Sequence, residues 1–170
     1  MGLVAASLDI FFALVLLGAA LHKLVSFNRL AAASARLAGV SAAFGPILTC
    51  CAAAWEVTSA LAILFEPSRP LGLAAAAVLW GAYAVLTWRV KLRGQAFDCG
   101  CTFGSAGRGA DPLTVPRAAG LSLAAAGLAL LPVPPQFGVT AILAGLAFLG
   151  LLVAAGELAA VIPMSRRLSQ

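Results

Sequence analysis

Long uninterrupted apolar blocks decide what this chain can fold into. Five of them hold roughly 20 residues or more, enough at about 1.5 Å per residue for a helix to cross a hydrocarbon core of about 30 Å. They cover residues 3–24, 46–65, 70–90, 113–131 and 137–163. A backbone in lipid must satisfy its own hydrogen bonds, so the blocks predict an all-α, polytopic membrane bundle of about five transmembrane helices, a four-helix core plus one. The fourth block is short and alanine-rich, and it fits either a full span or a re-entrant segment.

Composition agrees with a membrane setting. Hydrophobic residues make up 62% of the 170, charged residues 10%, and the mean hydropathy is +1.04, so a water-facing surface could not be covered. No repeat or soluble domain is visible, and residues 1–170 are expected to form one membrane domain. The first block is not typical of a signal peptide, because no Lys or Arg precedes it and Asp9 occupies the usual positive region.

Between the first two blocks, apolar residues recur at roughly helical spacing with two arginines among them: Phe27, Leu30, Leu37 and Val40, with Arg29 and Arg36. This pattern fits an interfacial amphipathic helix. A plain basic loop fits it equally well.

Charge predicts the orientation, because short loops rich in Lys and Arg stay in the cytoplasm. With five spans, only Arg69 falls on one face. The other face receives Lys23, Arg29, Arg36, Arg89, Lys91, Arg93, Arg108, Arg117, Arg166 and Arg167. We therefore expect a multi-pass protein of the plasma (inner) membrane, with the N-terminus outside and the C-terminus and the loop 93–112 cytoplasmic. The net charge of +5 then indicates contact with anionic lipid headgroups and not with nucleic acid.

Four cysteines form two pairs. Cys50 and Cys51 lie a little over one turn into the second span, and Cys99 and Cys101 flank a glycine in the loop after the third. Two crossings separate the pairs, so both lie toward the same membrane face. Adjacent cysteines in a helix point about 100° apart and bridge poorly, whereas a Cys-Gly-Cys bridge is possible but strained, and strained disulfides are the labile, catalytic kind. The pattern predicts thiol–disulfide exchange between the pairs and a redox partner.

Other interpretations remain open. Four thiolates on one face also suit a soft ion such as copper or mercury, which would make the protein a metal carrier. Cysteines in an apolar helix are often only small buried hydrophobes, and the chain could also be a non-catalytic anchor for a redox enzyme. A structural zinc site is not expected, because there is no Cys-x-x-Cys and only one histidine.

Charged residues inside the spans call for a functional explanation. Glu56 lies near the middle of the second span, about 120–140° around the helix from Cys50 and Cys51, so it is a poor direct proton acceptor for them. We expect it to pair with a polar group on a neighbouring helix or to remain the neutral acid. Lys23 at the end of the first span either snorkels, faces Glu56, or, like His22, acts on a thiol. Asp9 and Glu157 are nearer the span ends, where headgroup or water contact would explain them.

Three features together resemble the MauE family of methylamine-utilisation membrane proteins, allied to the DoxX group. They are Ala20-Leu-His-Lys-Leu24 ending the first span, Trp55-Glu56 in the second, and Asp98-Cys-Gly-Cys-Thr-Phe-Gly104 after the third. The resemblance covers roughly residues 3–135. It implies a helical-bundle protein associated with thiol redox chemistry, working with a thioredoxin-fold partner. By this resemblance Cys99 and Cys101 would be the redox pair and Glu56 a buried acid.

Two features depart from that family. Thr102 is inserted before the Phe103-Gly104 that usually follows the second thiol directly, and the family accounts for neither Cys50 nor Cys51. A second pair is similar in role to quinone-linked disulfide-forming enzymes, so a quinone is a possible cofactor. Its site would be lined by the aromatics Trp55, Trp80, Tyr83 and Trp88, which equally fit interfacial anchors. A family acting on exported proteins would need its thiols outside, whereas the charge pattern places them in the cytoplasm.

Overall fold

Six helices make up most of the described chain. The structure, a computed structural model, describes residues 2–93, 114–132 and 136–168, with the side chains at 157 and 159–168 left out. The helices are α1 (Gly2–Val25), α2 (Phe27–Ala38), α3 (Gly45–Leu64), α4 (Arg69–Leu92), α5 (Thr114–Ala129) and α6 (Val139–Leu168). Short 3₁₀ turns cover Ala42–Phe44 and Glu66–Ser68, and the described residues include no strand.

The all-α membrane bundle is confirmed. Among the described residues, four segments are long and apolar enough to cross a membrane, namely Gly2–Val25, Ala42–Leu64, Glu66–Leu92 and Val139–Gly156. The fourth expected span is the exception, because α5 has 16 residues and at about 1.5 Å each covers only roughly 24 Å. Four membrane-spanning candidates and one shorter helix agree with a four-helix core plus one, and a full crossing by α5 stays a prediction.

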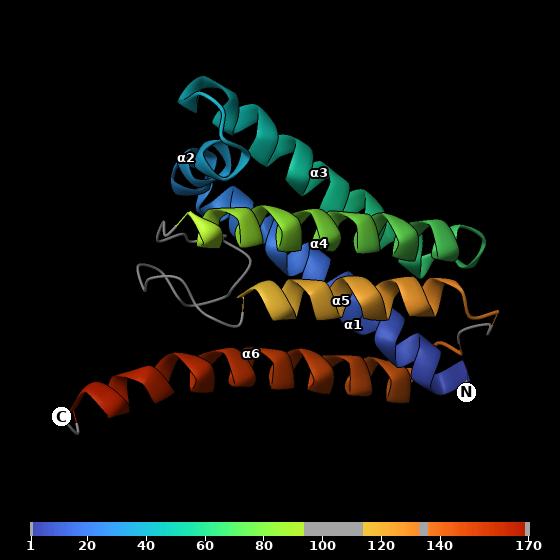
Figure 1. The fold of residues 1–170 in the computed structure, drawn as a ribbon. Coiled ribbons are helices and arrows are strands. Elements are labelled where there is room, and N and C mark those ends of the chain that lie inside the picture. Colours follow the sequence, from blue (N-terminus) through green and yellow to red (C-terminus); the bar gives the residue numbers. More distant parts are fainter. Residues whose placement is uncertain (1, 94–113, 133–135, 169–170) are drawn as a thin grey trace.

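The helices alternate in direction (Figure 1). Helix α1 lies against α3 and α6, and α4 lies between α3 and α5. One apolar core joins four of the helices, with Phe12 and Leu16 from α1, Ile63 from α3, and Leu73 and Trp80 from α4 at its centre, and Leu128 of α5 beside them. The Phe12 and Trp80 rings pack at 5.4 Å between centroids. Among the described candidate spans, α1 is the most buried inside the chain.

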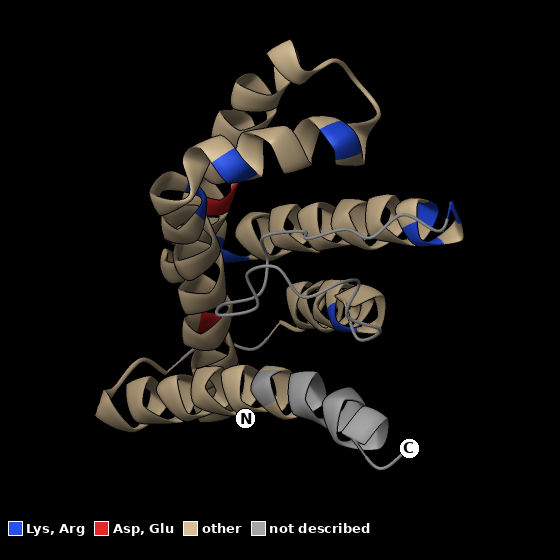
Figure 2. Ribbon diagram, turned by 90° about the vertical axis from the view of Figure 1, so that its left-hand side faces the viewer, with Lys and Arg blue, Asp and Glu red and all other residues tan. Residues whose placement is uncertain are grey.

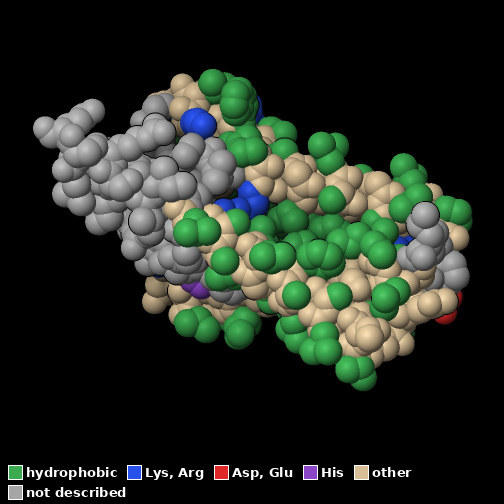
Figure 3. All heavy atoms as spheres, turned by 90° about the horizontal axis from the view of Figure 1, so that it is seen from below, with side chains coloured by type: hydrophobic (Ala, Val, Ile, Leu, Met, Phe, Trp, Pro, Cys, Tyr) green, Lys and Arg blue, Asp and Glu red, His purple; other side chains and the backbone are tan. Residues whose placement is uncertain are grey.

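The outer surface is apolar, as a lipid-facing surface must be. Figure 3 shows hydrophobic side chains over the described face and an apolar hollow between two helices. Figure 2 shows how few charged positions interrupt the long helices. A multi-pass membrane protein accounts for both features.

The segment between the first two spans is helical over Phe27–Ala38, which supports the amphipathic helix over the plain loop. Its buried residues, Leu30, Ala31, Ala33 and Ala35, belong to the face toward α3. Gly39 ends the helix at φ 71°, a left-handed conformation that glycine adopts without steric cost. Val40 lies beyond this end and is exposed, so the helical spacing does not extend to it.

Helix α4 approaches α3 closely through Gly72. A Cβ atom at that position would lie 2.6 Å from the backbone nitrogen of Ile63, a distance that real contacts do not reach. Gly72, Leu73, Ala76 and Ala77 are buried within the chain. The small residues of α4 therefore serve helix packing inside one copy, as small residues commonly do in membranes.

Candidate functional site

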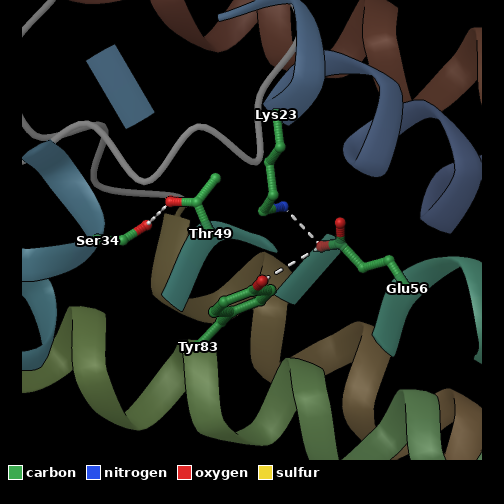
Figure 4. A network of polar contacts seen from close by, with 5 residues as sticks. All are labelled: Lys23, Ser34, Thr49, Glu56 and Tyr83. Carbon is green, nitrogen blue, oxygen red and sulfur yellow. Dashed lines mark hydrogen bonds and ion pairs between the residues drawn. The ribbon is translucent and has the colours of Figure 1, made fainter. Parts of the chain in front are cut away.

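The most polar part of the interior joins α1, α3 and α4 around Glu56. Lys23 Nζ donates to Glu56 Oε1 over 2.6 Å, and Tyr83 Oη donates to the same oxygen over 3.2 Å (Figure 4). Lys23 is 4% exposed and Glu56 1%. Of the interpretations open for Glu56 and Lys23, the structure therefore selects pairing across the bundle, and Lys23 does not snorkel.

The two oxygens of the Glu56 carboxylate have different surroundings. Oε1 accepts both hydrogen bonds, whereas Oε2 is buried and has no hydrogen-bond partner in the described part of the chain. The Lys23 ammonium also lies 5.4 Å from the centre of the Tyr83 ring, close enough for a cation–π contact. The lysine is thus held from two sides, while the carboxylate keeps unused acceptor capacity.

A second buried ion pair links α1 to α4. Arg69 Nε donates to Asp9 Oδ2 over 2.7 Å, with Asp9 0% and Arg69 4% exposed. The expectation that headgroup or water contact explains Asp9 is wrong, because the folded chain removes its carboxylate from solvent altogether. Glu157, expected to behave similarly, has its side chain outside the described residues.

This second pair was missed at the sequence level, although one signal pointed to it. Asp9 and Arg69 were both expected near the outer face, and opposite charges at the same depth are candidates for pairing. Arg69 was instead counted as a loop cation. The proline-rich turn before α4 places it at the first residue of that helix, facing inward.

The cysteines of α3 face away from the buried acid. Cys50 and Cys51 are both exposed free thiols, with no disulfide between them. Thr49, Ala53 and Glu56 recur at intervals of four and three residues on the buried face of α3, which turns Cys50 and Cys51 outward. Glu56 therefore does not share a face with either thiol. Cys99 and Cys101 lie outside the described residues.

The helix ends that flank the other cysteine pair are described. The end of α4, the start of α5 and the first turns of α3 lie on the same side of the bundle (Figure 1). The described helix ends on either side of the loop 93–112 therefore lie on the side of the bundle where α3, which carries Cys50 and Cys51 in its second turn, begins.

Helix α2 is attached to this end by a hydrogen bond that the sequence did not suggest. Thr49 Oγ1 donates to Ser34 Oγ over 3.1 Å, and Thr49 is 1% exposed (Figure 4). His22, the other candidate for influencing a thiol, has its Nε2 atom 3.3 Å from Nη2 of Arg29 on α2. Both contacts join α2 to the spans beside the cysteines.

The aromatic residues considered for a quinone site do not gather in one place. Trp80 is buried in the core against Phe12, Trp88 is exposed, and exposed Trp55 donates its ring N–H to the carbonyl of Ala75. Only Tyr83 reaches the polar cluster around Glu56. A quinone remains a prediction, and these four side chains do not form its common lining.

Metal-ligating residues are sparse in the described ranges. Across residues 2–93, 114–132 and 136–156, no three His, Cys, Asp or Glu side chains lie together as a set that could hold a metal ion.

Comparison with known proteins identifies the relatives of the bundle. The family described as Methylamine utilisation protein MauE matches residues 1–131, more than three quarters of the chain. The chain belongs to the MauE family. In this MauE protein the match covers α1 to α5 and ends before α6. Neither the curated proteins nor the solved structures include a match.

Proposed function

We propose that this MauE protein carries out thiol–disulfide exchange at the membrane. Cys99 and Cys101 form the pair that reacts with a partner, and Cys50 and Cys51 form the second pair. The observation that carries the proposal is the position of two exposed free thiols at the end of the bundle where the loop 93–112 joins α4 and α5.

The chemistry needs no reactant beyond a dithiol and a disulfide. A thiolate of the reduced pair attacks one sulfur of the disulfide and forms a mixed disulfide, releasing the other sulfur as a thiolate. The second thiolate of the attacking pair then attacks the mixed disulfide, which leaves the attacking pair oxidised and the original disulfide fully reduced. Two electrons and, after protonation, two protons pass from the dithiol to the disulfide. A thioredoxin-fold protein is the partner class that the family resemblance favours.

In this scheme Glu56 does not accept the proton of a cysteine thiol. Its carboxylate is bound by Lys23 and Tyr83 on the buried face of α3, opposite Cys50 and Cys51. Its part in the proposal is to hold α1, α3 and α4 in register below the thiols.

The proposed orientation places the cysteines in the cytoplasm. Lys23 and Arg69 are each neutralised inside the bundle. With α5 crossing the membrane, setting both aside leaves nine cations on one face and none on the other. The partner is then a cytoplasmic redox protein. A membrane-impermeant maleimide added to intact cells is expected to miss Cys99 and Cys101, and labelling of either residue contradicts this orientation.

The exchange itself is tested on anaerobically purified protein. We expect thiol counting and mass spectrometry to find a Cys99–Cys101 disulfide that a reduced thioredoxin-fold protein removes, and Cys99→Ser and Cys101→Ser to abolish the reaction. Ser122→Ala is the matched control, because that hydroxyl lies in α5 and donates to the carbonyl of Ala77. Unchanged exchange in both cysteine variants refutes the proposal. Four free thiols with stoichiometric metal would identify a soft-metal carrier instead.

A further inference from the structure

Two buried polar atoms lie one helical turn apart on α3 with their hydrogen-bonding capacity unused. Glu56 Oε2 and Ser59 Oγ have no hydrogen-bond partner among the described residues, and the two residues are 1% and 3% exposed. Buried polar atoms are nearly always hydrogen-bonded in native proteins. Two such atoms, on residues three positions apart on one helix, can share one small ligand.

Ser59 differs from other hydroxyl residues of these spans. Ser7, Thr58 and Thr87 each donate to the carbonyl four residues earlier, over 2.8, 2.9 and 2.6 Å. This local bond is the usual way in which a hydroxyl in a membrane helix is satisfied. Ser59 makes no such bond, so its hydroxyl keeps both a donor and an acceptor for another molecule.

The charges around the site define the chemistry of that molecule. The Lys23 ammonium contacts Oε1 of the same carboxylate and repels a second cation, while the carboxylate itself repels an anion. A neutral group that donates to Oε2 and exchanges a hydrogen bond with Ser59 remains. Side chains three residues apart on a helix have Cβ atoms about 5–6 Å apart, a separation that one oxygen with two hydrogen bonds of about 2.8 Å spans.

We propose that Glu56 and Ser59 hold a buried water molecule, which completes the hydrogen bonding of this polar cluster inside the bundle. The two carboxylate oxygens then have separate roles. Oε1 binds Lys23 and Tyr83 and keeps the helices together, and Oε2 accepts a hydrogen bond from the water while the ion pair stays intact. Two protein partners lie at the lower end of the usual two to four for a buried water. The proposal does not depend on the chemistry of the cysteines.

Stability separates a hydrated site from a dry one, because the two predict opposite signs. If Ser59 anchors a water, Ser59→Ala removes one of its partners and lowers the midpoint of unfolding of the full-length protein in detergent. If the hydroxyl is dry and unpaired, the same change removes a buried unsatisfied group and leaves the midpoint equal or raises it. The matched control is Ser7→Ala, since Ser7 is also 3% exposed but its hydroxyl is bonded to Leu3.

Infrared spectroscopy of the reconstituted protein gives a second readout. A water band that shifts in H₂¹⁸O is expected in the wild type and in Ser7→Ala, and its loss is expected in Ser59→Ala. The proposal is overturned if the unfolding midpoint of Ser59→Ala is at or above that of the wild type. Identical ¹⁸O-sensitive bands in the wild type and in Ser59→Ala also overturn it.

Discussion

Replacing Lys23 with methionine is expected to destabilise the bundle far more than its loss of one hydrogen bond suggests. Methionine keeps most of the length of the lysine side chain. It leaves the Glu56 carboxylate, which is only 1% exposed, without its cation. Removing one partner of a buried ion pair costs about 3–5 kcal/mol. If Glu56 instead stays buried as the neutral acid, its carboxyl must be protonated at pH 7. For a carboxyl of ordinary pKa about 4.3, this costs roughly 3.7 kcal/mol, at about 1.4 kcal/mol per unit of difference between pH and pKa. Both routes predict a loss within about 3–5 kcal/mol.

Two further variants isolate the ion pair. Glu56→Gln in the Lys23→Met background is expected to recover most of the loss, because an amide needs no counter-ion and its oxygen still accepts from Tyr83. Lys91→Met is the matched control, since Lys91 is also near the end of a span but is exposed, and no measurable loss is expected there. Unfolding titrations in mixed detergent micelles measure all four proteins. A loss in Lys23→Met as small as in Lys91→Met, or no recovery in the double variant, refutes the reasoning.

Three smaller predictions follow from the packing. Arg69→Met is expected to destabilise the protein by about 3–5 kcal/mol in the same titration, and adding Asp9→Asn is expected to restore most of that loss. If the losses of the two single variants simply add in the double variant, the ion pair does not carry this stability. Tyr83→Phe is expected to cost about 1 kcal/mol for its bond to the carboxylate, and a loss above about 3 kcal/mol would mean that the ring has another role. Gly72→Val is expected to prevent the α3–α4 contact and lower folded yield by gel filtration, whereas Gly127→Ala, whose Cβ meets nothing within 4 Å, is expected to behave as the wild type.

Much of the fold could be predicted because local physics determines it. Apolar blocks bounded by prolines define helices in lipid, since the backbone there has no other way to satisfy its hydrogen bonds. The helical period also placed Glu56 away from Cys50 and Cys51, as the exposure of the thiols and the burial of the acid bear out. Helix α5 was harder to assign, because an alanine-rich block leaves the end of a helix undefined and the folded one has 16 residues.

The partners of the buried charges were not predictable in the same way. Facing Glu56 was one of several options for Lys23, and nothing local distinguished it from snorkelling. The choice depends on how α1 crosses α3, which brings together residues 33 positions apart. The Ser34–Thr49 bond and the unused capacity of Ser59 depend on helix rotation in the same way.

The sequence by itself determined that this protein is a helical membrane bundle with two cysteine pairs and few buried charges, because composition and period act within one segment. Only the tertiary structure decided which charges meet. Asp9 and Arg69 are 60 residues apart and become partners because α1 and α4 pack with those positions at the same depth. In lipid, where apolar contact does not favour one helix pairing over another, such polar contacts and close glycine packing set the arrangement, and both depend on the positions of all the helices together.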